Sequence, residues 1–525
     1  MRDFHKPGRS AVYATNGMCA TSHPLAAQVA VATLQEGGNA MDAALAGAVL
    51  LGLCEPPMTG IGGDLFALVS PAGGDEVIAL NGSGRAPAGA DARRLREAGH
   101  KDVPLNGVDA ITLPGAVDAI CRLSTCWGKL GLDRVLAPSI HYAEAGVPVA
   151  PRVAVDWAAN TGTLQGHGKT WFTHGGQAPS VGALFRAPGQ AEVLRRIADQ
   201  GRDAFYTGEV ADDMLATLKA HGGVHTRTDF ASVCCDETVP VSGSYKGVEL
   251  LEHPPNGQGA TAILLLNILA QFDIAAMDPW GAERAHIETE ASKLAYDTRN
   301  ALIGDPDHTT RLDHMLDMDT ARRLAALIDP NRALPRPAPG SEAVHRDTVY
   351  ITVVDKDRMA VSLIYSIFHS FGSGIASEKF GILFQNRGAG FTLTPGHPNE
   401  MGPGKRPMHT IIPGMLRQDG RVTMSFGVMG GQYQSCGHAR FVTNLRDFGL
   451  DLQEALDAPR CFSEGGALRV ERGYSDAVRA ELVEKGHNVV EPETAIGGAQ
   501  AIAIGDDGVL TGASDPRKDG IALGY

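Results

Sequence analysis

The sequence predicts a large α+β protein, and three observations carry that prediction. The first half alternates helix and turn signals, with a few strand-like runs between them. From residue 348 onward the pattern changes to β-branched runs separated by tight turns. A proline-rich stretch lies between the two halves. The chain has 525 residues, 43% of them hydrophobic and 20% charged, which suits several domains or one large globular unit.

Two alanine-rich helices are predicted near the N-terminus. Pro24 fits the first turn of "PLAAQVAVATLQ", which ends at Gly37 and Gly38, and Asn39 fits the N-cap of "NAMDAALAGAVLLGL". Their small side chains allow the two helices to pack closely. The runs "LFALVS" and "EVIALNGSG" predict strands. Further helical stretches are expected around residues 115–145, 191–221 and 279–329.

The second half is predicted to be rich in antiparallel strands. The runs "TVYITVVD" and "AVSLIYSIF" flank the turn "KDRM", which is typical of a hairpin that feeds a sheet. Strand-like runs continue at "GILFQN" and "TMSFGVMGG". Near the C-terminus, "AQAIAIGDDGVLTGASD" predicts a second hairpin, with its turn at "DDG".

Charge and hydropathy exclude several kinds of partner. The net charge of −14 disfavours nucleic acid or an anionic membrane surface, because no basic patch offsets phosphate repulsion. The N-terminus has no apolar core of signal-peptide length, and no run reaches the roughly 18 apolar residues that span a bilayer. We therefore expect a cytoplasmic protein with neither nucleic acid nor membrane as a partner.

No cofactor and no metal site are predicted. The run "GIGGD" at residues 60–64 lacks the Gly-x-Gly-x-x-Gly spacing of a dinucleotide site. His221 and His225 have His-x-x-x-His spacing, but the two glycines between them favour a turn over a helix. His286 is interpreted as an isolated histidine. The eight cysteines are scattered, without the Cys-x-x-Cys pairs of zinc or redox sites.

The junction between the halves carries a possible nucleophile. Residues 330–347 are rich in proline, a composition typical of extended loops where chain cleavage concentrates. A threonine needs no separate histidine as a base if its own free α-amine takes the proton, which requires it to begin a chain. Cleavage between Asp347 and Thr348 would create that arrangement. Threonine is also common at strand starts, so this pattern alone leaves both interpretations open.

Four blocks of sequence extend the interpretation. They are "GMCATSHPLAAQ…EGGNAMDAALA" with "MTGIGGD", "TVYITVVDKD…FGSGI", "GPGKRPMHT…FGVMGG" and "GASDPRKDGIALGY". In this order they resemble the γ-glutamyltransferase family of N-terminal-nucleophile hydrolases. The resemblance implies a four-layer αββα sandwich made as a self-cleaving precursor. Its large subunit would be residues 1–347 and its small subunit residues 348–525, together one structural unit that can form a homo-oligomer.

The resemblance also implies the catalytic residues. Thr348 matches the nucleophile, which is the first threonine of the family's Thr-Thr-His-x-Ser-Val-Val-Asp motif, although the next two residues differ. Ser366 matches the threonine whose hydroxyl contacts the nucleophile, and it is expected on the neighbouring strand of the predicted hairpin. Gly430 and Gly431 match the pair that forms an oxyanion hole. Glycine suits that role because backbone N–H groups can approach developing negative charge without a side chain in the way.

The family's substrate-recognition positions are altered. The expected substrate-binding residues are Ser83, Arg85, Phe368, Arg387, and the pair His409 and Thr410, which replaces two serines. Ser83 stands where the family has the arginine that clamps a carboxylate, and Arg85 lies two residues further on. Phe368 replaces an asparagine. Arg387 and Gly390 replace the glutamine and the aspartate of a Gln-x-x-Asp motif that holds the substrate amine.

These differences predict a self-processing amide hydrolase that acts on a small amide bearing a carboxylate, such as oxamate, or on an N-acyl compound. A guanidinium pairs with a carboxylate through two parallel bonds, so Arg387 favours such a substrate. A purely structural ion-pair role for Arg387 stays open. Two alternatives also stay open: a γ-glutamyltransferase or glutathione hydrolase, and a decayed enzyme that only binds. The second would be favoured by loss of Thr348, Ser366 or the glycine pair, and all are present.

Overall fold

Two stacked antiparallel sheets form the centre of the molecule. The computed structural model describes residues 5, 8–74, 76–334 and 348–525. The first seven-stranded sheet has the order β19 (Ile521–Gly524), β2 (Met18–Thr21), β10 (Val349–Val354), β11 (Ala360–Ser366), β3 (Asp64–Ser70), β4 (Ile78–Gly82) and β7 (Asp236–Thr238). The second has the order β1 (Val12–Ala14), β18 (Leu510–Ser514), β17 (Gly498–Ile504), β13 (Arg421–Met429), β12 (Gly414–Gln418), β9 (Val248–Glu252) and β8 (Val241–Tyr245).

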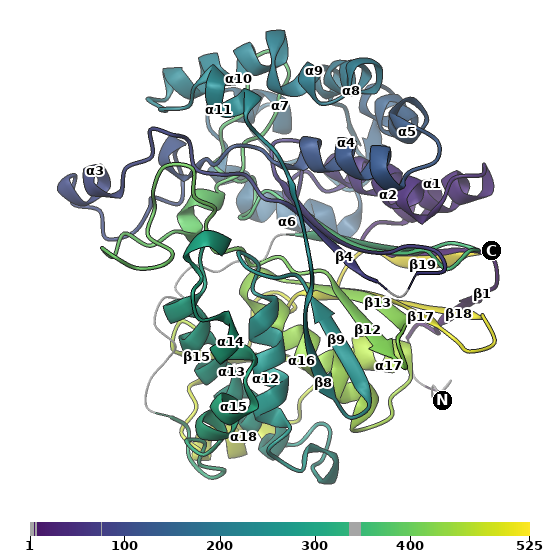
Figure 1. The fold of residues 1–525 in the computed structure, drawn as a ribbon, viewed down its shortest axis with the longest axis vertical. Helices are drawn as coiled ribbons and strands as arrows, with labels where there is room; N and C mark the ends of the chain where they lie inside the picture. Colours follow the sequence, from purple (N-terminus) through teal and green to yellow (C-terminus); the bar gives the residue numbers. More distant parts are fainter. Residues whose placement is uncertain (1–4, 6–7, 75, 335–347) are drawn as a thin grey trace.

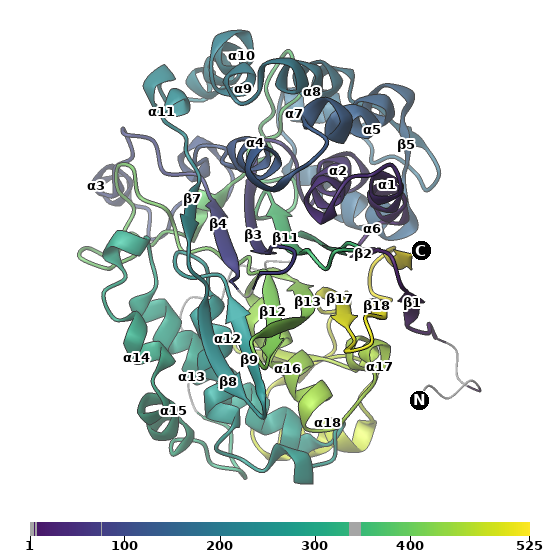
Figure 2. The same ribbon diagram turned by 45° about the vertical axis from the view of Figure 1, so that its right-hand side comes forward.

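Helices cover the outer face of each sheet (Figure 1). The layer over the first sheet contains α1 (Pro24–Gln35), α2 (Ala40–Cys54), α4 (Ala116–Trp127), α5 (Leu132–Ala145), α6 (Pro151–Asn160), α7 (His167–Phe172), α8 (Pro188–Gln200), α9 (Asp203–Tyr206), α10 (Gly208–Ala220) and α11 (Arg227–Ala231). The layer over the second contains α12 (Gly259–Leu269), α13 (Ala282–Leu302), α14 (Leu312–Leu316), α15 (Met318–Ala325), α16 (Gln434–Arg446) and α17 (Leu452–Asp457). Figure 2 shows β3 and β11 above β12 and β13, so the expected αββα sandwich is confirmed.

Smaller elements lie at the periphery. A helix α3 (Ala92–Glu97) projects from one side (Figure 1). A three-stranded sheet contains β14 (Cys461–Glu464), β15 (Ala467–Val470) and β16 (Val489–Val490), beside α18 (Asp476–Glu484). A two-stranded sheet contains β5 (Val147–Pro148) and β6 (Leu184–Phe185).

The predicted N-terminal helices are confirmed. Pro24 is the first residue of α1, and Asn39 caps α2 through a capping box in which its side chain accepts from the Asp42 N–H while Asp42 accepts from the Asn39 N–H. Every residue of α2 is buried. Its alanines and glycines let it lie against both α1 and the strand β10, since a Cβ at Gly47 would come within 2.5 Å of the Ile351 side chain.

Both sheets combine strands from before and after residue 348. The predicted hairpin of β10 and β11 forms with Val349 opposite Tyr365. On its outer sides β10 pairs with β2 and β11 pairs with β3, and in the other sheet β12 pairs with β9. Neither part of the chain could complete a sheet alone without exposing unpaired edges. The second predicted hairpin also forms, with Ile504 opposite Leu510.

One predicted strand is wrong. The run "GILFQN", residues 381–386, contains only an isolated bridge between Leu383 and Ala376. Gly381 has φ +65°, and the side chains of Gln385 and Asn386 donate to Asp64 at the start of β3 and to the Leu105 carbonyl oxygen. These long-range hydrogen bonds of Gln385 and Asn386 outweigh the strand propensity of the run. The proline-rich residues 335–347, with the predicted cleavage residue Asp347, lie outside the described residues.

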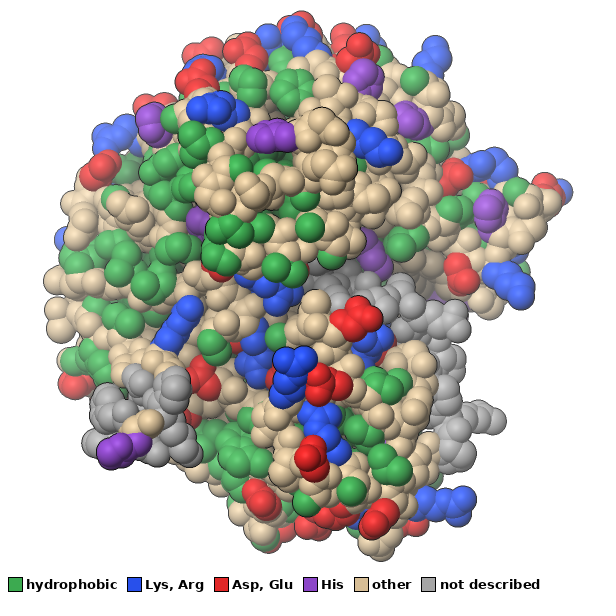
Figure 3. Space-filling view, turned by 180° about the vertical axis from the view of Figure 1, so that it is seen from behind, with side chains coloured by type: hydrophobic (Ala, Val, Ile, Leu, Met, Phe, Trp, Pro, Cys, Tyr) green, Lys and Arg blue, Asp and Glu red, His purple; other side chains and the backbone are tan. Residues whose placement is uncertain are grey.

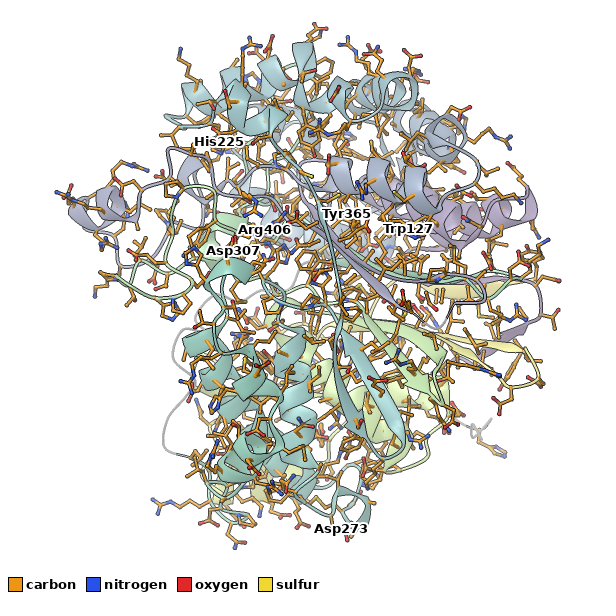
Figure 4. All side chains as sticks on the ribbon, viewed as in Figure 1. Trp127, His225, Asp273, Asp307, Tyr365 and Arg406 are labelled. Carbon is orange, nitrogen blue, oxygen red and sulfur yellow. The ribbon has the colours of Figure 1, made fainter. Side chains whose placement is uncertain are left out.

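Three further observations concern the helices, the surface and the turn after α10. No helix among the described residues combines the length and the apolar character needed to cross a membrane. Acidic and basic side chains are interspersed on the face in Figure 3. The expected turn after α10 is present, since Gly222 has φ +81°, and the ring Nε2 of His225 lies 2.9 Å from the Ile111 carbonyl oxygen (Figure 4).

Candidate active site

Thr348 and Ser366 face each other at one end of the first sheet. Thr348 immediately precedes β10, and Ser366 is the last residue of β11, so the hairpin register brings them together. The Thr348 hydroxyl lies 3.4 Å from the Ser366 Oγ, which is longer than a usual hydroxyl bond. Both side chains are fully buried. The sequence-predicted pair is therefore placed as expected, next to the junction.

The backbone turns sharply after Ser366. Phe368 has φ +80°, a left-handed conformation that costs energy for a side chain of this size. The turn lets the Phe368 N–H donate to the Ser366 Oγ at 2.9 Å. It also places the Phe368 ring 4.0 Å from the guanidinium carbon of Arg387, a cation–π contact. Phe368 thus forms an apolar wall beside Ser366, at the position where the family pattern has a polar asparagine.

Arg387 lies directly beside this pair, although it is distant in sequence. Its Nη2 is 3.4 Å from the Ser366 Oγ, and its Nη1 donates to the Thr410 Oγ1 at 3.2 Å. The guanidinium is fully buried, and burial lowers its pKa to about 9, against the opposing effect of Asp64. Arg387 is therefore still protonated at neutral pH. One hydroxyl separates this buried cation from the Thr348 Oγ1.

Asp64 is the counter-ion of Arg387, and the sequence did not identify it as a site residue. Its Oδ2 is 3.8 Å from the Arg387 Nε, and its Oδ1 accepts from the Gly84 N–H at 2.7 Å and from the Gln385 Nε2 at 2.9 Å. Burial raises its pKa to about 6, although Arg387 opposes that shift. The available signal was an acidic residue at the start of the fully buried strand β3, directly after a glycine-rich run.

His409 contacts Asp64, whereas Thr410 contacts Arg387. The His409 Nε2 is 3.0 Å from the Asp64 Oδ2, and the Ile411 N–H approaches its Nδ1 at 3.4 Å, so the ring proton belongs on Nε2 and points at Asp64. The His409 ring also contacts the Phe66 ring, with 4.6 Å between centroids. Thr410 contacts Arg387. The Asp64 carboxylate thus contacts two of the predicted substrate-binding side chains, Arg387 and His409.

Ser83 and Arg85 make their hydrogen bonds and ion pairs with residues other than Arg387. The Ser83 Oγ accepts from the Asn256 Nδ2 at 3.0 Å, and its carbonyl accepts from the Arg406 Nε at 2.7 Å. Arg406, which is labelled in Figure 4, has a side chain that is only 1% exposed. Arg85 pairs with Asp305 at 3.4 Å and Asp236 at 3.5 Å, and its side chain is 39% exposed. These contacts make Arg85 a rim residue, and we do not assign the substrate carboxylate to it.

Gly430 and Gly431 form a turn at the end of β13. Both have positive φ, +121° and +55°. A Cβ at Gly430 would lie 2.8 Å from the Gly497 Cα, so the close approach of two backbones requires glycine there. Gln258 donates to the Gly431 carbonyl at 3.2 Å, which fixes the orientation of that peptide. The geometry suits a pair of backbone N–H donors held in a rigid turn.

The interpretation of His286 as isolated was wrong. Its Nδ1 lies 2.7 Å from the His487 Nε2, and with Glu290 these residues offer ligand atoms within 4.8 Å of one another. Glu290 is already paired with the Lys293 Nζ at 2.6 Å and accepts from the Leu334 N–H at 2.7 Å. Because protein donors occupy these atoms, we interpret the group as an anchor that joins the parts of the chain before and after residue 348.

The arrangement has the parts of an acyl-transfer site. A hydroxyl nucleophile, a supporting hydroxyl and a rigid pair of glycine peptides are the components needed to form and stabilise a tetrahedral intermediate. The additional component is a buried cation. Its position beside Ser366 would place a substrate anion close to the reacting carbonyl.

Comparisons with known proteins agree with this chemistry. The family model described as gamma-glutamyltranspeptidase matches residues 26–525. The chain is 36% identical to the glutathione hydrolase-like YwrD proenzyme of Bacillus subtilis, over 98% of this chain and 99% of the relative. It is also 36% identical to the oxamate amidohydrolase proenzyme of Klebsiella pneumoniae, over 97% and 99%. The crystal structure of cephalosporin acylase from Bacillus halodurans superposes with a TM-score of 0.92 at 38% identity, covering 100% of this chain and 99% of that one.

The names of these relatives describe related chemistry. Hydrolysis of an amide is common to the three kinds of enzyme that their names describe, and two of them are named as proenzymes. The match of the family model extends over most of the chain and includes all the site residues described above. The chain belongs to the gamma-glutamyltranspeptidase family and is a hydrolase of amide bonds.

Proposed function

We propose that the chain cleaves itself between Asp347 and Thr348 and then hydrolyses a small amide that carries a carboxylate next to the scissile carbonyl, as oxamate does. The products of self-cleavage would be a large subunit of residues 1–347 and a small subunit of residues 348–525. One observation carries the substrate assignment: the buried Arg387 guanidinium is 3.4 Å from the Ser366 hydroxyl, which in turn contacts Thr348.

The chemistry follows from the position of Thr348. After cleavage its α-amine takes the proton of its own Oγ1, which attacks the substrate carbonyl carbon. The N–H groups of Gly430 and Gly431 stabilise the oxyanion of the tetrahedral intermediate. The intermediate collapses to an ester when the C–N bond breaks and the amine leaves with the proton. Water, deprotonated by the same α-amine, then attacks the ester carbonyl carbon, the bond to Thr348 Oγ1 breaks, the acid is released and the α-ammonium returns its proton to Oγ1.

The substrate carboxylate would bind to Arg387 and Thr410. Burial of an unpaired carboxylate is costly, and Arg387 is the cation nearest to the nucleophile among the contacts described above. Oxamate carries its carboxylate on the carbon next to the scissile carbonyl, so a cation beside the nucleophile fits it. A γ-glutamyl group carries its charged ends further away, and Gly390 offers no carboxylate for its ammonium group.

The names of the relatives support an amide hydrolase, and one of two relatives with 36% identity supports the oxamate-like substrate, while the other is named glutathione hydrolase-like. One of them is named an oxamate amidohydrolase, and a structure with a TM-score of 0.92 is titled a cephalosporin acylase. Thr348, Ser366, Arg387 and Thr410 are all fully buried in the uncut chain. A substrate would therefore reach them only after a rearrangement, and self-cleavage next to Thr348 is the proposed cause.

The test compares specificity constants of the purified enzyme. We expect oxamate to be hydrolysed with a much higher kcat/KM than glutathione or a γ-glutamyl anilide. Ammonia release measures turnover of oxamate, glutamate release that of glutathione, and aniline release that of the anilide. Efficient hydrolysis of glutathione would favour an ordinary glutathione hydrolase or γ-glutamyltransferase. Binding of oxamate without turnover by a correctly cleaved enzyme would favour a decayed, binding-only protein. The absence of a cofactor, the homo-oligomer and the cytoplasmic location stay predictions.

A further inference from the structure

A buried arginine lies behind the Gly430–Gly431 turn. Arg299, on α13, is 2% exposed. Its Nη1 donates to the Gln258 Oε1 and to the Gln432 Oε1, both at 2.6 Å. Its Nη2 and Nε donate to the Asn300 Oδ1 at 2.7 and 3.0 Å. The acceptors around this guanidinium are therefore three neutral amide oxygens.

Arg284 on the same helix provides a contrast. It is also fully buried, but its Nε donates to the carboxylate of Glu288 at 2.7 Å, so its charge is compensated. Burial lowers the pKa of Arg299 to about 10, and it remains protonated at neutral pH. Besides the amide oxygens, the guanidinium contacts the Tyr296 ring, whose centroid lies 4.4 Å from the guanidinium carbon. Burial of a charge without an anionic partner costs free energy. The location of Arg299 suggests what its charge is used for.

Gln258 and Gln432 connect Arg299 to the candidate oxyanion hole, Gln258 through a hydrogen bond to Gly431 and Gln432 through its own backbone. The Gln258 Nε2 donates to the Thr410 carbonyl at 2.6 Å and to the Gly431 carbonyl at 3.2 Å. Gln432 directly follows Gly431, so its backbone N–H belongs to the same peptide as the Gly431 carbonyl. By holding the oxygen of each side-chain amide, Arg299 fixes which way the Gln258 NH₂ group points. It thereby fixes the loops of both Thr410 and Gly431.

We propose that Arg299 is a positioning residue for the oxyanion hole, which aligns the Gly430–Gly431 turn through Gln258 and Gln432 and places a positive charge behind it. The inference rests on the proposed function, because it requires an oxyanion at this turn. Positive charge held in a buried site before reaction stabilises negative charge that develops only in the transition state. Arg299 should therefore affect kcat and leave KM nearly unchanged.

The decisive variant is Gln432→Glu. It gives Arg299 a carboxylate partner at the position of the present Oε1, so the folded protein should be at least as stable as wild type. The charge behind the turn is then neutralised, and we expect kcat for oxamate to fall about 10-fold or more, with KM changed less than about threefold. A purely structural role for Arg299 predicts an equal or higher Tm with kcat unchanged, which would overturn the proposal.

Arginine variants supply the matched controls. Arg299→Met should lower kcat about 10- to 100-fold, and Arg299→Lys should recover part of that loss because the charge returns. Arg284→Met removes an arginine of equal burial from the same helix, and it should lower Tm without a comparable loss of kcat. Equal losses of kcat in the Arg284 and Arg299 variants would contradict the proposal.

Self-cleavage provides a second readout. The attack of Thr348 on the Asp347 carbonyl also forms an oxyanion, so Gln432→Glu should slow the appearance of the two chains on denaturing gels by a similar factor. If wild type proves inactive on every amide tested, the proposed function fails, whatever the variants do. If wild type is active and Gln432→Glu matches it in both turnover and cleavage, the inference about Arg299 alone fails.

Discussion

Replacement of Arg387 by methionine tests the substrate assignment in detail. Methionine keeps much of the side-chain volume and removes the guanidinium that contacts Ser366 and Thr410. It also leaves the buried Asp64 without its cation, so the variant should be less stable than wild type. The double variant Asp64→Asn with Arg387→Met removes both charges and should recover stability, because no unpaired carboxylate remains.

The expected magnitude follows from the contacts. A buried hydrogen bond to a charged group contributes about 1.5–3 kcal/mol, and a guanidinium can make two of them to one carboxylate. Asp64 lies 3.8 Å from the guanidinium and partly compensates its charge, so we take the lower value for each hydrogen bond. The two bonds together then contribute about 3 kcal/mol. At about 1.4 kcal/mol for each tenfold change, kcat/KM for oxamate should fall roughly 100-fold.

The assay compares oxamate with oxamide, its neutral analogue, by ammonia release. Because both substrates meet the same folded fraction of enzyme, the ratio of their kcat/KM values is insensitive to lost stability. Arg387→Met should reduce that ratio about 100-fold. Arg406→Met, which removes another fully buried arginine bonded to Ser83, should leave the ratio unchanged. Equal losses on both substrates in the Arg387 variant would refute a carboxylate-binding role.

Three further predictions concern the nucleophile and its surroundings. Thr348→Ala should abolish both self-cleavage and turnover, whereas Thr348→Ser should keep part of each, as chain separation on gels and ammonia release will show. Ser366→Ala should lower kcat about 10-fold with Tm nearly unchanged, since its bond to the reacting hydroxyl matters most in the transition state; a lower Tm with normal kcat would make Ser366 structural. Because burial raises the pKa of Asp64 to about 6, Asp64 is protonated below that pH and competes for Arg387 above it. The KM for oxamate should therefore rise as pH increases through about 6, and Asp64→Asn should remove that rise. Asp64 favours the folded state at low pH, and this contribution is lost as pH rises from 3.8 to about 6.

Local sequence pattern was sufficient to predict those parts of the fold in which the interacting residues are close in sequence. The alternation in "TVYITVVD" and "AVSLIYSIF" specified the hairpin, and the hairpin register then places Thr348 opposite Ser366. Asn39 could be assigned as an N-cap because the cap and its Asp42 partner are three residues apart. In each case the interacting groups belong to one element or to adjacent elements.

Long-range pairing could not be predicted in this way. Asp64, Arg387 and His409 come from three distant segments, and no periodicity relates a carboxylate at the start of β3 to a loop arginine after β11. The same limit explains the strand wrongly expected at residues 381–386. The Gln385 side chain donates to Asp64 at the start of β3, and a bond to a residue so distant in sequence can override a local strand preference.

The identity of the N-terminal residue of the small subunit tests the central claim most directly. Intact-mass spectrometry and N-terminal sequencing of the purified, active protein should show two chains, residues 1–347 and residues 348–525, with the second beginning Thr-Val-Tyr. The Thr348→Ala variant, purified in parallel, should give one uncut chain. An active wild-type enzyme with a single intact chain would contradict the account, because Thr348 would then have no free α-amine to act as its base.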